Sequence, residues 1–196
     1  MGQARLYLGD EAVARGVLDA GLGSAYGYPG TPSTEILESL IAWQESETDP
    51  PAGEYVARWC TNEKAAYEQA LGAAMAGARS LVTMKHVGLN VAADPFMNSA
   101  LLDLSGGLVV AVADDPGMHS SQNEQDTRYY ADFARTVCLE PADPQETYDL
   151  ARAAFELSED LHQPVVLRLV TRVAHARGIV RVGGATGRTR KPPASA

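Results

Sequence analysis

The sequence predicts an α/β fold with a doubly wound, mainly parallel sheet and helices on both of its faces. Apolar runs at residues 80–85, 107–114 and 164–170 are continuous rather than alternating, as in strands that are covered on both faces. Segments with helical periodicity and capping residues lie between such runs. A regular alternation of strands and helices is typical of a parallel sheet.

Capping residues and apolar stripes give the order of the elements. Asp10 is predicted to cap the first helix, and Thr31, followed by Pro32, is predicted to cap the second. The stretch 143–146, Asp-Pro-Gln-Glu, is a capping box that opens the last long helix. The expected elements are a helix ending at Gly21, a strand at 24–28, a helix through Ile41, a loop at 47–54, a strand at 55–60, a helix at 62–79, a strand at 80–85, a turn at 86–90, a helix to about Leu102, a strand at 107–114, a polar stretch to Arg128, a strand at 136–141, a helix to about Leu161 and a strand at 164–170.

Composition limits the classes of function. The 196 residues include 25 acidic and 16 basic ones, and the net charge of −9 argues against nucleic-acid binding. No apolar run is long enough to cross a bilayer, and the N-terminus lacks the apolar core of a secretory signal. We therefore expect a cytoplasmic protein with no membrane contact. Residues 1–178 are expected to form one domain, and the basic, Gly- and Pro-rich residues 179–196 a flexible tail or linker.

The sequence gives little support for thiol or metal chemistry in this chain. Cys60 and Cys138 are too few to hold an iron–sulfur cluster, and both are predicted to be small, buried apolar residues. The four histidines show no metal-ligand spacing, so we expect no metal ligands in the chain.

Polar segments follow four of the predicted strands. These segments are 28–33, 61–64, 85–90 and 114–126, and each is polar, interrupted by Gly or Pro, or both. In open parallel sheets, ligands bind at the carboxyl ends of the strands. We therefore expect the four segments to converge on one edge of the sheet and to form a ligand site there.

Three features of these segments are candidates for chemistry, each with a structural alternative. Glu63 either complements the dipole of the helix that it opens or points its carboxylate into a ligand cleft. Lys85 and His86 form either a solvated turn or a pair of donors to an anionic or carbonyl-bearing ligand. The stretch 114–126 is either a surface loop or a functional one.

Four stretches resemble a known family over most of the chain, from about Gly9 to Gly178. They are GDEAVARGVLDAG, GYPGTPSTEI, NEKAAYEQALGAAMAGARSLVTMKHVGLNVAADPFMNSA and VAVADDPGMHSSQNEQDTR. They resemble the N-terminal pyrimidine-binding domain of the alpha subunits of indolepyruvate:ferredoxin oxidoreductases. These subunits belong to the thiamine diphosphate-dependent 2-oxoacid:ferredoxin oxidoreductase family, and KHVGLNVAAD is specific to the indolepyruvate branch.

The resemblance implies a thiamine diphosphate-binding fold of the pyrimidine-domain type, and it implies site residues. In the family, a glutamate that follows a strand hydrogen-bonds N1′ of the aminopyrimidine, and Glu63 in TNEKAA matches this catalytic position. The other implied cofactor-binding residues are Tyr28, Pro29, Gly30, Thr31, Gly88 and Asn90, and the implied substrate-facing residues are Thr31, Lys85 and His86. An arginine that the pyruvate enzymes carry is absent from ADDPG, so details of pyruvate binding do not transfer.

The resemblance also implies a reaction and its partners. The reaction is the oxidative decarboxylation of indolepyruvate or another aryl 2-oxoacid with coenzyme A, with electrons passing to ferredoxin. The Mg²⁺-binding signature and the cysteine-rich cluster segment of the family are not found in this sequence. We therefore expect a diphosphate-binding domain or subunit that binds Mg²⁺, and an iron–sulfur or ferredoxin domain, as partners. Iron–sulfur clusters and coenzyme A are expected only in the complete enzyme, and the chain alone is expected to be inactive.

The sequence also allows self-association and two alternative functions. The Ala- and Gly-rich helix at 62–79 offers a smooth face, which favours either a homo-oligomer or close packing within the monomer. The chain could be the small subunit of a split thiamine-dependent decarboxylase that acts without oxidation on sulfopyruvate or phosphonopyruvate. It could also be a non-catalytic scaffold that keeps the fold for subunit contacts.

Overall fold

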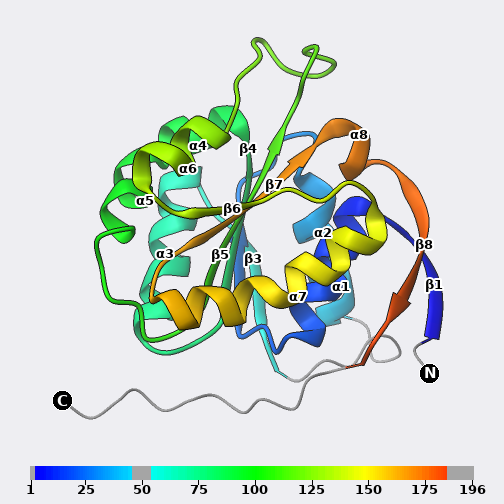
Figure 1. The fold of residues 1–196 in the computed structure, drawn as a ribbon, viewed down its shortest axis with the longest axis horizontal. Helices are drawn as coiled ribbons and strands as arrows, with labels where there is room; N and C mark the ends of the chain where they lie inside the picture. Colours follow the sequence, from blue (N-terminus) through cyan, green and yellow to red (C-terminus); the bar gives the residue numbers. More distant parts are fainter. Residues whose placement is uncertain (1–2, 46–53, 185–196) are drawn as a thin grey trace.

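The computed structural model describes residues 3–45 and 54–184, and a parallel sheet lies at its centre (Figure 1). In this part of the chain, six parallel strands lie in the order β3-β2-β4-β5-β7-β6. Their bounds are Ser24–Gly27 for β2, Val56–Trp59 for β3, Ser80–Lys85 for β4, Leu108–Asp114 for β5, Val137–Leu139 for β6 and Val165–Val170 for β7. The predicted doubly wound α/β fold is confirmed.

Helices cover both faces of this sheet (Figure 1). One face carries α1 (Gly9–Asp19), α2 (Thr34–Glu45) and α7 (Pro144–Leu161). The other carries α3 (Glu63–Met75), α4 (His86–Val91), α5 (Ala93–Ser99) and α6 (Arg128–Ala134). Each layer encloses its own apolar core, and the inner strands β4 and β5 contribute alternate side chains to both cores. The short α8 (Thr171–Ala174) follows β7.

The strand order places a topological switch point between β2 and β4. The chain runs outward from β2 to β3 and then returns to the other side of β2 as β4. The helix that follows β2 and the helix that follows β3 lie on opposite faces of the sheet (Figure 1). The chain segments after β2 and β4 therefore diverge at this point, which is where open α/β sheets bind ligands.

A two-stranded antiparallel ribbon lies beside the main sheet and was not expected from the sequence. It consists of β1 (Gln3–Leu8) and β8 (Arg177–Val182), and Tyr7 and Val180 bury its inner side against Ala12 and Tyr148. Exposed residues alternate with less exposed ones in β8 and make up half of β1, so neither strand forms a continuous apolar run. Residues 179–182 of the expected tail belong to β8, whereas residues 185–196 and most of the expected 47–54 loop lie outside the described residues.

Local predictions at helix ends were confirmed in one case and wrong in others. Asp143 caps α7 as predicted, because the Glu146 N–H donates to Asp143 Oδ1 over 2.9 Å. The predicted capping box is incomplete, since the Glu146 carboxylate accepts the Ala142 N–H and not that of Asp143. Asp10 does not cap α1, which begins one residue earlier, and the Leu8 N–H is instead accepted by the Glu11 carboxylate. The α6 helix, inside the region where no helix was expected, was missed.

The two cysteines are free and half-buried, so their expected full burial was only partly correct. Burial raises the pKa of the Cys138 thiol to about 11, and burial also raises the pKa of Cys60. Both thiols are therefore protonated and unreactive near neutral pH. Among the helices in the described residues, none is long and apolar enough to span a membrane.

Close packing of α1 on α7 gives a direct test of this fold. A Cβ at Gly16 would lie 2.7 Å from the Tyr148 carbonyl oxygen and 2.8 Å from the Ala151 Cβ. Gly72, on the exposed side of α3, would meet nothing within 4 Å.

We expect Gly16→Ala to lower the free energy of unfolding by roughly 1–3 kcal/mol, because the two helices must move apart. Gly72→Ala is the matched control, and the helix propensity of alanine should make it more stable by up to about 1 kcal/mol. Urea unfolding of the two variants measures both effects. A Gly16→Ala variant as stable as the Gly72→Ala variant would contradict the packing of α1 on α7.

Candidate functional site

The four polar segments after β2, β3, β4 and β5 meet at the carboxyl edge of the sheet. Gly30 lies against Lys85, since a Cβ at Gly30 would be 2.8 Å from the lysine Cδ. The His86 ring contacts the Asn123 carbonyl oxygen over 3.1 Å, which joins the β4 segment to the β5 loop. The third junction, between Glu63 and Gly88, joins the β3 segment to the β4 segment. The convergence that the topology predicted is therefore present.

Glu63 is the first residue of α3 and is half-buried at this edge. The Asn62 side chain caps the helix by accepting the Ala65 N–H over 2.8 Å, which leaves the Glu63 carboxylate free to point elsewhere. A Cβ at Gly88 would lie only 2.7 Å from both Cγ and Oε1 of Glu63. Within the described residues, the Glu63 carboxylate has no hydrogen bond or ion pair. Its position at a helix N-terminus is favourable for a negative charge, and its two oxygens remain available to a ligand.

The segment between β2 and α2 forms a compact turn, and it corrects the predicted helix start. The helix begins at Thr34, so Thr31 is not its cap and Pro32 is not its first residue. The Gly30 N–H donates to Thr34 Oγ1 over 2.9 Å, and the Ser33 N–H and hydroxyl both donate to the Gly30 carbonyl. These bonds fold the chain back before the helix starts, and the Thr31–Pro32 peptide is cis. Thr31 itself is exposed at the edge.

Tyr28 and Pro29 precede this turn and are both exposed. At Gly30, a Cβ would lie 2.8 Å from Lys85 Cδ, so a side chain there would have to displace the lysine side chain. The turn thus presents Tyr28, Pro29 and Thr31 at the surface beside the strand ends. Their expected roles in cofactor and substrate binding stay predictions.

Lys85 and His86 form the end of β4 and the start of α4, so the predicted turn at 86–90 is wrong. The helix forms because its inner residues Gly88 and Leu89 are buried against the rest of the domain. Lys85 is half-buried, and the one hydrogen bond of its Nζ to a described residue is long, 3.4 Å to the Ser120 carbonyl oxygen. Its ammonium group therefore retains donors for a ligand.

His86 is almost fully buried, with 1% of its surface exposed. Its Nε2 lies against the Asn123 carbonyl oxygen, which can only accept, so this nitrogen donates. The other ring nitrogen, Nδ1, is buried and has no partner among the described residues. A buried nitrogen without a partner is unusual in a folded protein, and it is a feature expected at a ligand site.

Asn90 lies one turn further along α4 and is exposed. Its Oδ1 accepts a hydrogen bond from the Tyr130 hydroxyl of α6 over 2.8 Å. The structure thus brings Gly88 next to Glu63 but joins Asn90 to α6. A cofactor-binding role for Asn90 stays a prediction.

Two buried aspartates at the end of β5 anchor the long loop, a role that sequence reasoning missed. The Asp114 carboxylate accepts hydrogen bonds from the Thr127 N–H over 3.0 Å and from Arg168 Nε over 2.6 Å. The Asp115 carboxylate accepts from the Ser120 N–H over 2.8 Å and from the Thr171 hydroxyl over 2.7 Å. The signal for this role is the Asp-Asp pair placed directly at the end of the most apolar strand.

The hydrogen bonds to Asp115 also change its acidity. Burial alone would raise the pKa of this carboxyl, but bonds from Ser120, Thr171, Ser121 and His119 outweigh burial and hold it well below its usual range. The carboxylate is thus charged at all ordinary pH values and fixes the start of the loop.

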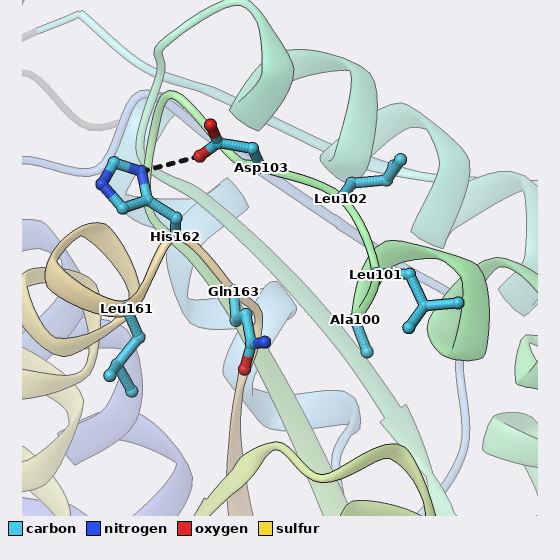
Figure 2. A pocket seen from close by; sticks show the side chains of 7 residues that line it. All are labelled: Ala100, Leu101, Leu102, Asp103, Leu161, His162 and Gln163. Atoms are coloured by element: carbon cyan, nitrogen blue, oxygen red, sulfur yellow. Dashed lines mark ion pairs between the residues drawn. The ribbon is translucent and has the colours of Figure 1, made fainter.

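A pocket of about 400 Å³ lies elsewhere, at the amino end of β7 (Figure 2). It is lined by residues 100–103 after α5 and by residues 161–163 at the end of α7. Figure 2 shows His162 and Asp103 pointing toward each other, and their ion pair measures 3.0 Å. None of the residues singled out from the sequence lines this pocket, so the candidate site is the opposite, polar edge of the sheet.

The fold and this edge define a class of protein: a parallel α/β domain whose polar strand ends form an exposed candidate ligand site at a switch point. Residues 15–191 match the family described as pyruvate flavodoxin/ferredoxin oxidoreductase, thiamine diphosphate-binding. The chain belongs to this family.

Individual relatives agree with this assignment. The chain is 50% identical, over 93% of its length, to indolepyruvate oxidoreductase subunit IorA of Thermococcus kodakarensis, and 50% identical, over 97%, to the subunit of the same name from Methanothermobacter thermautotrophicus. It spans 27% and 29% of the lengths of these two relatives. Its fold matches a 2-oxoglutarate:ferredoxin oxidoreductase from Magnetococcus marinus with a TM-score of 0.81 at 20% identity, covering 97% of this chain and 34% of that one.

The anchoring role of Asp115 predicts a specific pH dependence. Because the pKa of Asp115 is lowered in the folded state, the unfolded chain takes up this proton first, as the pH falls below about 4. The stabilisation by the carboxylate is present above that pH and is lost as the pH falls toward the folded-state pKa.

We expect Asp115→Asn to lower the free energy of unfolding near neutral pH by roughly 1–3 kcal/mol, because buried donors lose their acceptor. The difference from the wild type should shrink below about pH 4. Asp132→Asn, at an exposed position on α6, is the control and should change stability by less than about 0.5 kcal/mol. A difference for Asp115→Asn that does not depend on pH in urea unfolding would contradict the lowered pKa.

Proposed function

We propose that this chain supplies the pyrimidine-binding half of a thiamine diphosphate site in a 2-oxoacid:ferredoxin oxidoreductase. The proposed substrate is indolepyruvate or another aryl 2-oxoacid, as the names of the two indolepyruvate oxidoreductase relatives suggest. Because the chain spans less than a third of those relatives, the activity belongs to a larger assembly of which this domain is one part. We propose that the chain alone is inactive.

The observation that carries this proposal is the free carboxylate of Glu63 beside Gly88. A carboxyl group that shares a proton with a ring nitrogen needs oxygens without other partners and open space next to them. Glu63 meets the first condition among the described residues, and its partial exposure at the edge of the sheet meets the second. Gly88 leaves room for the glutamate side chain itself, because a Cβ there would lie 2.7 Å from Glu63 Oε1. The residues present therefore fit an aminopyrimidine. When bound, thiamine diphosphate supplies the carbanion chemistry that removes the carboxyl group of a 2-oxoacid.

Glu63 has a defined task in this arrangement. Its carboxyl would form the hydrogen bond to the ring nitrogen N1′ and would thereby favour one tautomer of the ring. The Asn62 cap fixes the first turn of α3, so that the Glu63 backbone is rigid and only its side chain needs positioning. Contact with Gly88 limits the side-chain positions further.

Neighbouring residues suit the substrate. A 2-oxoacid carries a carboxylate and a carbonyl oxygen, and both accept hydrogen bonds. Lys85 offers an ammonium group with spare donors, and Thr31 offers an exposed hydroxyl on the turn that packs against it. His86 offers an unpartnered Nδ1 to a group or water at the edge. We propose that these three residues face the substrate, with Tyr28, Pro29, Gly30, Gly88 and Asn90 beside the cofactor.

The proposed reaction requires further domains or subunits and a second substrate, coenzyme A. A diphosphate-binding domain or subunit would bind Mg²⁺ and the diphosphate, and an iron–sulfur domain would accept the electrons. Coenzyme A would take the acyl group in the complete enzyme, and the assembly would be a homo-oligomer of such units. Both cysteines are free, as is usual in a reducing compartment, and we propose that the enzyme acts in the cytoplasm.

Replacement of Glu63 tests the proposed task. In the complete enzyme, we expect Glu63→Gln to lower kcat by about 100-fold or more, because an amide cannot hold the shared proton. Glu68→Gln is the matched control on the same helix. Glu68 is exposed, and Lys64 lies nearer to Asp94, at 3.0 Å, than to Glu68, at 3.9 Å. Full activity in Glu63→Gln would favour a scaffold without catalytic function.

Replacement of Gly88 tests the space beside Glu63. A Cβ at this position would overlap the flexible Glu63 side chain rather than backbone, so we expect the fold to persist and the carboxylate to move. Displacement of a catalytic group by about 1 Å can lower a rate by roughly 100-fold, and we expect a loss of this order in Gly88→Ala. Gly72→Ala, with open space around its Cβ, should retain full activity. An active Gly88→Ala enzyme would show that the contact with Glu63 has no functional role.

A further inference from the structure

The first turn of α1 holds a buried carboxyl group without a partner. Asp10 is 0% exposed, and both of its carboxylate oxygens lack a hydrogen-bond donor among the described residues. Burial raises the pKa of Asp10 well above its usual range, and so do the negative charge of Glu35 and the hydrogen bond that the two carboxyl groups can form by sharing a proton. An unpaired buried carboxylate is strongly unfavourable, so such a group calls for a compensating positive charge or a proton.

Two further ligand-type side chains point at Asp10 from other elements. Glu35 lies in the first turn of α2, and His175 follows α8 directly. One ligand atom from each of the three residues lies within 4.8 Å of the others, and Glu35 Oε1 is 3.6 Å from His175 Nε2. Glu35 Oε2 is also buried and has no hydrogen-bond partner in the described part of the chain. In residues 3–45 and 54–184, this is the one group of three such side chains at this spacing.

The backbone holds the segments that carry Asp10 and His175 against each other. The Gly9 N–H donates to the Ala176 carbonyl over 3.0 Å, which joins the start of α1 to the chain after α8. A Cβ at Gly9 would lie 2.0 Å from the Val173 carbonyl oxygen, so the two segments are in direct contact. A group of ligands that is placed before binding loses little entropy when an ion binds.

The donor set is suited to a particular class of ion. One imidazole nitrogen and two carboxylate oxygens are ligands that Zn²⁺ and similar divalent cations accept, and three protein ligands leave a fourth position for water. Two carboxylates also balance the charge of a divalent ion. The side chains of His175 and Glu35 are 38% and 36% exposed, which gives an ion access from solvent to the buried oxygens of Asp10.

We propose that Asp10, Glu35 and His175 bind one divalent cation of the zinc type, which ties α1, α2 and α8 together. The ion would also stabilise the turn after β2, because Glu35 adjoins Thr34, whose hydroxyl accepts the Gly30 N–H. The sequence could not indicate this site, since its three ligands are widely separated and show no ligand spacing.

Cobalt binding tests the proposal on the full 196-residue chain after treatment with a chelator. Co²⁺ replaces Zn²⁺ in such sites and absorbs visible light when it is coordinated by protein ligands. We expect one Co²⁺ per chain, displaced by Zn²⁺, in a titration without thiamine diphosphate. His175→Gln and Asp10→Asn should each weaken binding at least about tenfold, since loss of even an outer partner of a metal ligand has an effect of this size.

His162→Gln is the matched control, because His162 is a solvent-exposed histidine paired with Asp103 at the far edge of the sheet. Its cobalt affinity should equal that of the wild type. Circular dichroism establishes that each variant is folded. If Asp10→Asn does not fold, the cobalt affinity of His175→Gln decides the outcome, because His175 is partly exposed.

Two results would overturn the proposal. The first is the absence of saturable cobalt binding in the wild type, together with a rise in melting temperature in Asp10→Asn. That result would mean that Asp10 and Glu35 share a proton instead of a metal ion. The second is cobalt binding that His162→Gln removes and that His175→Gln leaves unchanged.

Discussion

Glu63 and Gly88 approach each other so closely that a side chain at position 88 would displace the Glu63 carboxylate, and the polar edge of the sheet is arranged around this contact. The contact joins α3 to α4 beside the switch point between β2 and β4. It places a carboxylate that has no other partner in residues 3–45 and 54–184 where parallel sheets bind ligands. A second close approach, of Gly30 to Lys85, brings the β2 turn against the same strand end.

Buried charge fixes the other side of this edge. Asp114 and Asp115 end the most apolar strand and hold both ends of the following loop through Thr127 and Ser120. Arg168, which is 4% exposed, neutralises Asp114. Separating Arg168 from Asp114 would leave an uncompensated buried charge, so this pair restricts the movement of the loop. The loop in turn places the Asn123 carbonyl oxygen against His86. The site therefore depends on two kinds of carboxylate. Asp114 and Asp115 anchor the loop, and Glu63 is proposed to act on a ligand.

The sequence predicted the sheet because β4, β5 and β7 are continuous apolar runs, whose burial depends little on local detail. It also predicted that Glu63 and the 85–90 segment would meet, because parallel topology alone brings strand ends together. It failed where tertiary contacts override local preference. Gly88 suggests a turn, yet its lack of a side chain is what lets α4 pack on Glu63.

Other features were inaccessible to sequence reasoning for different physical reasons. The β1–β8 ribbon pairs residues from opposite ends of the chain, and its half-exposed strands lack a strong pattern. The group of Asp10, Glu35 and His175 joins three separate elements, so no local spacing reveals it. The sequence suggests that Asp10 is a helix cap because aspartate is common at that position, whereas its burial results from the packing of α1, α2 and α8.

The central claim is that the Glu63 carboxyl binds the pyrimidine ring of thiamine diphosphate. A structure of the complete enzyme that contains this chain, with the cofactor bound, measures the claim directly. The account predicts that one carboxyl oxygen of Glu63 lies about 2.6–3.2 Å from N1′ of the ring, with Gly88 in contact with the cofactor or with the glutamate. A structure in which N1′ is bonded to a different side chain, with Glu63 turned away into solvent, would contradict it.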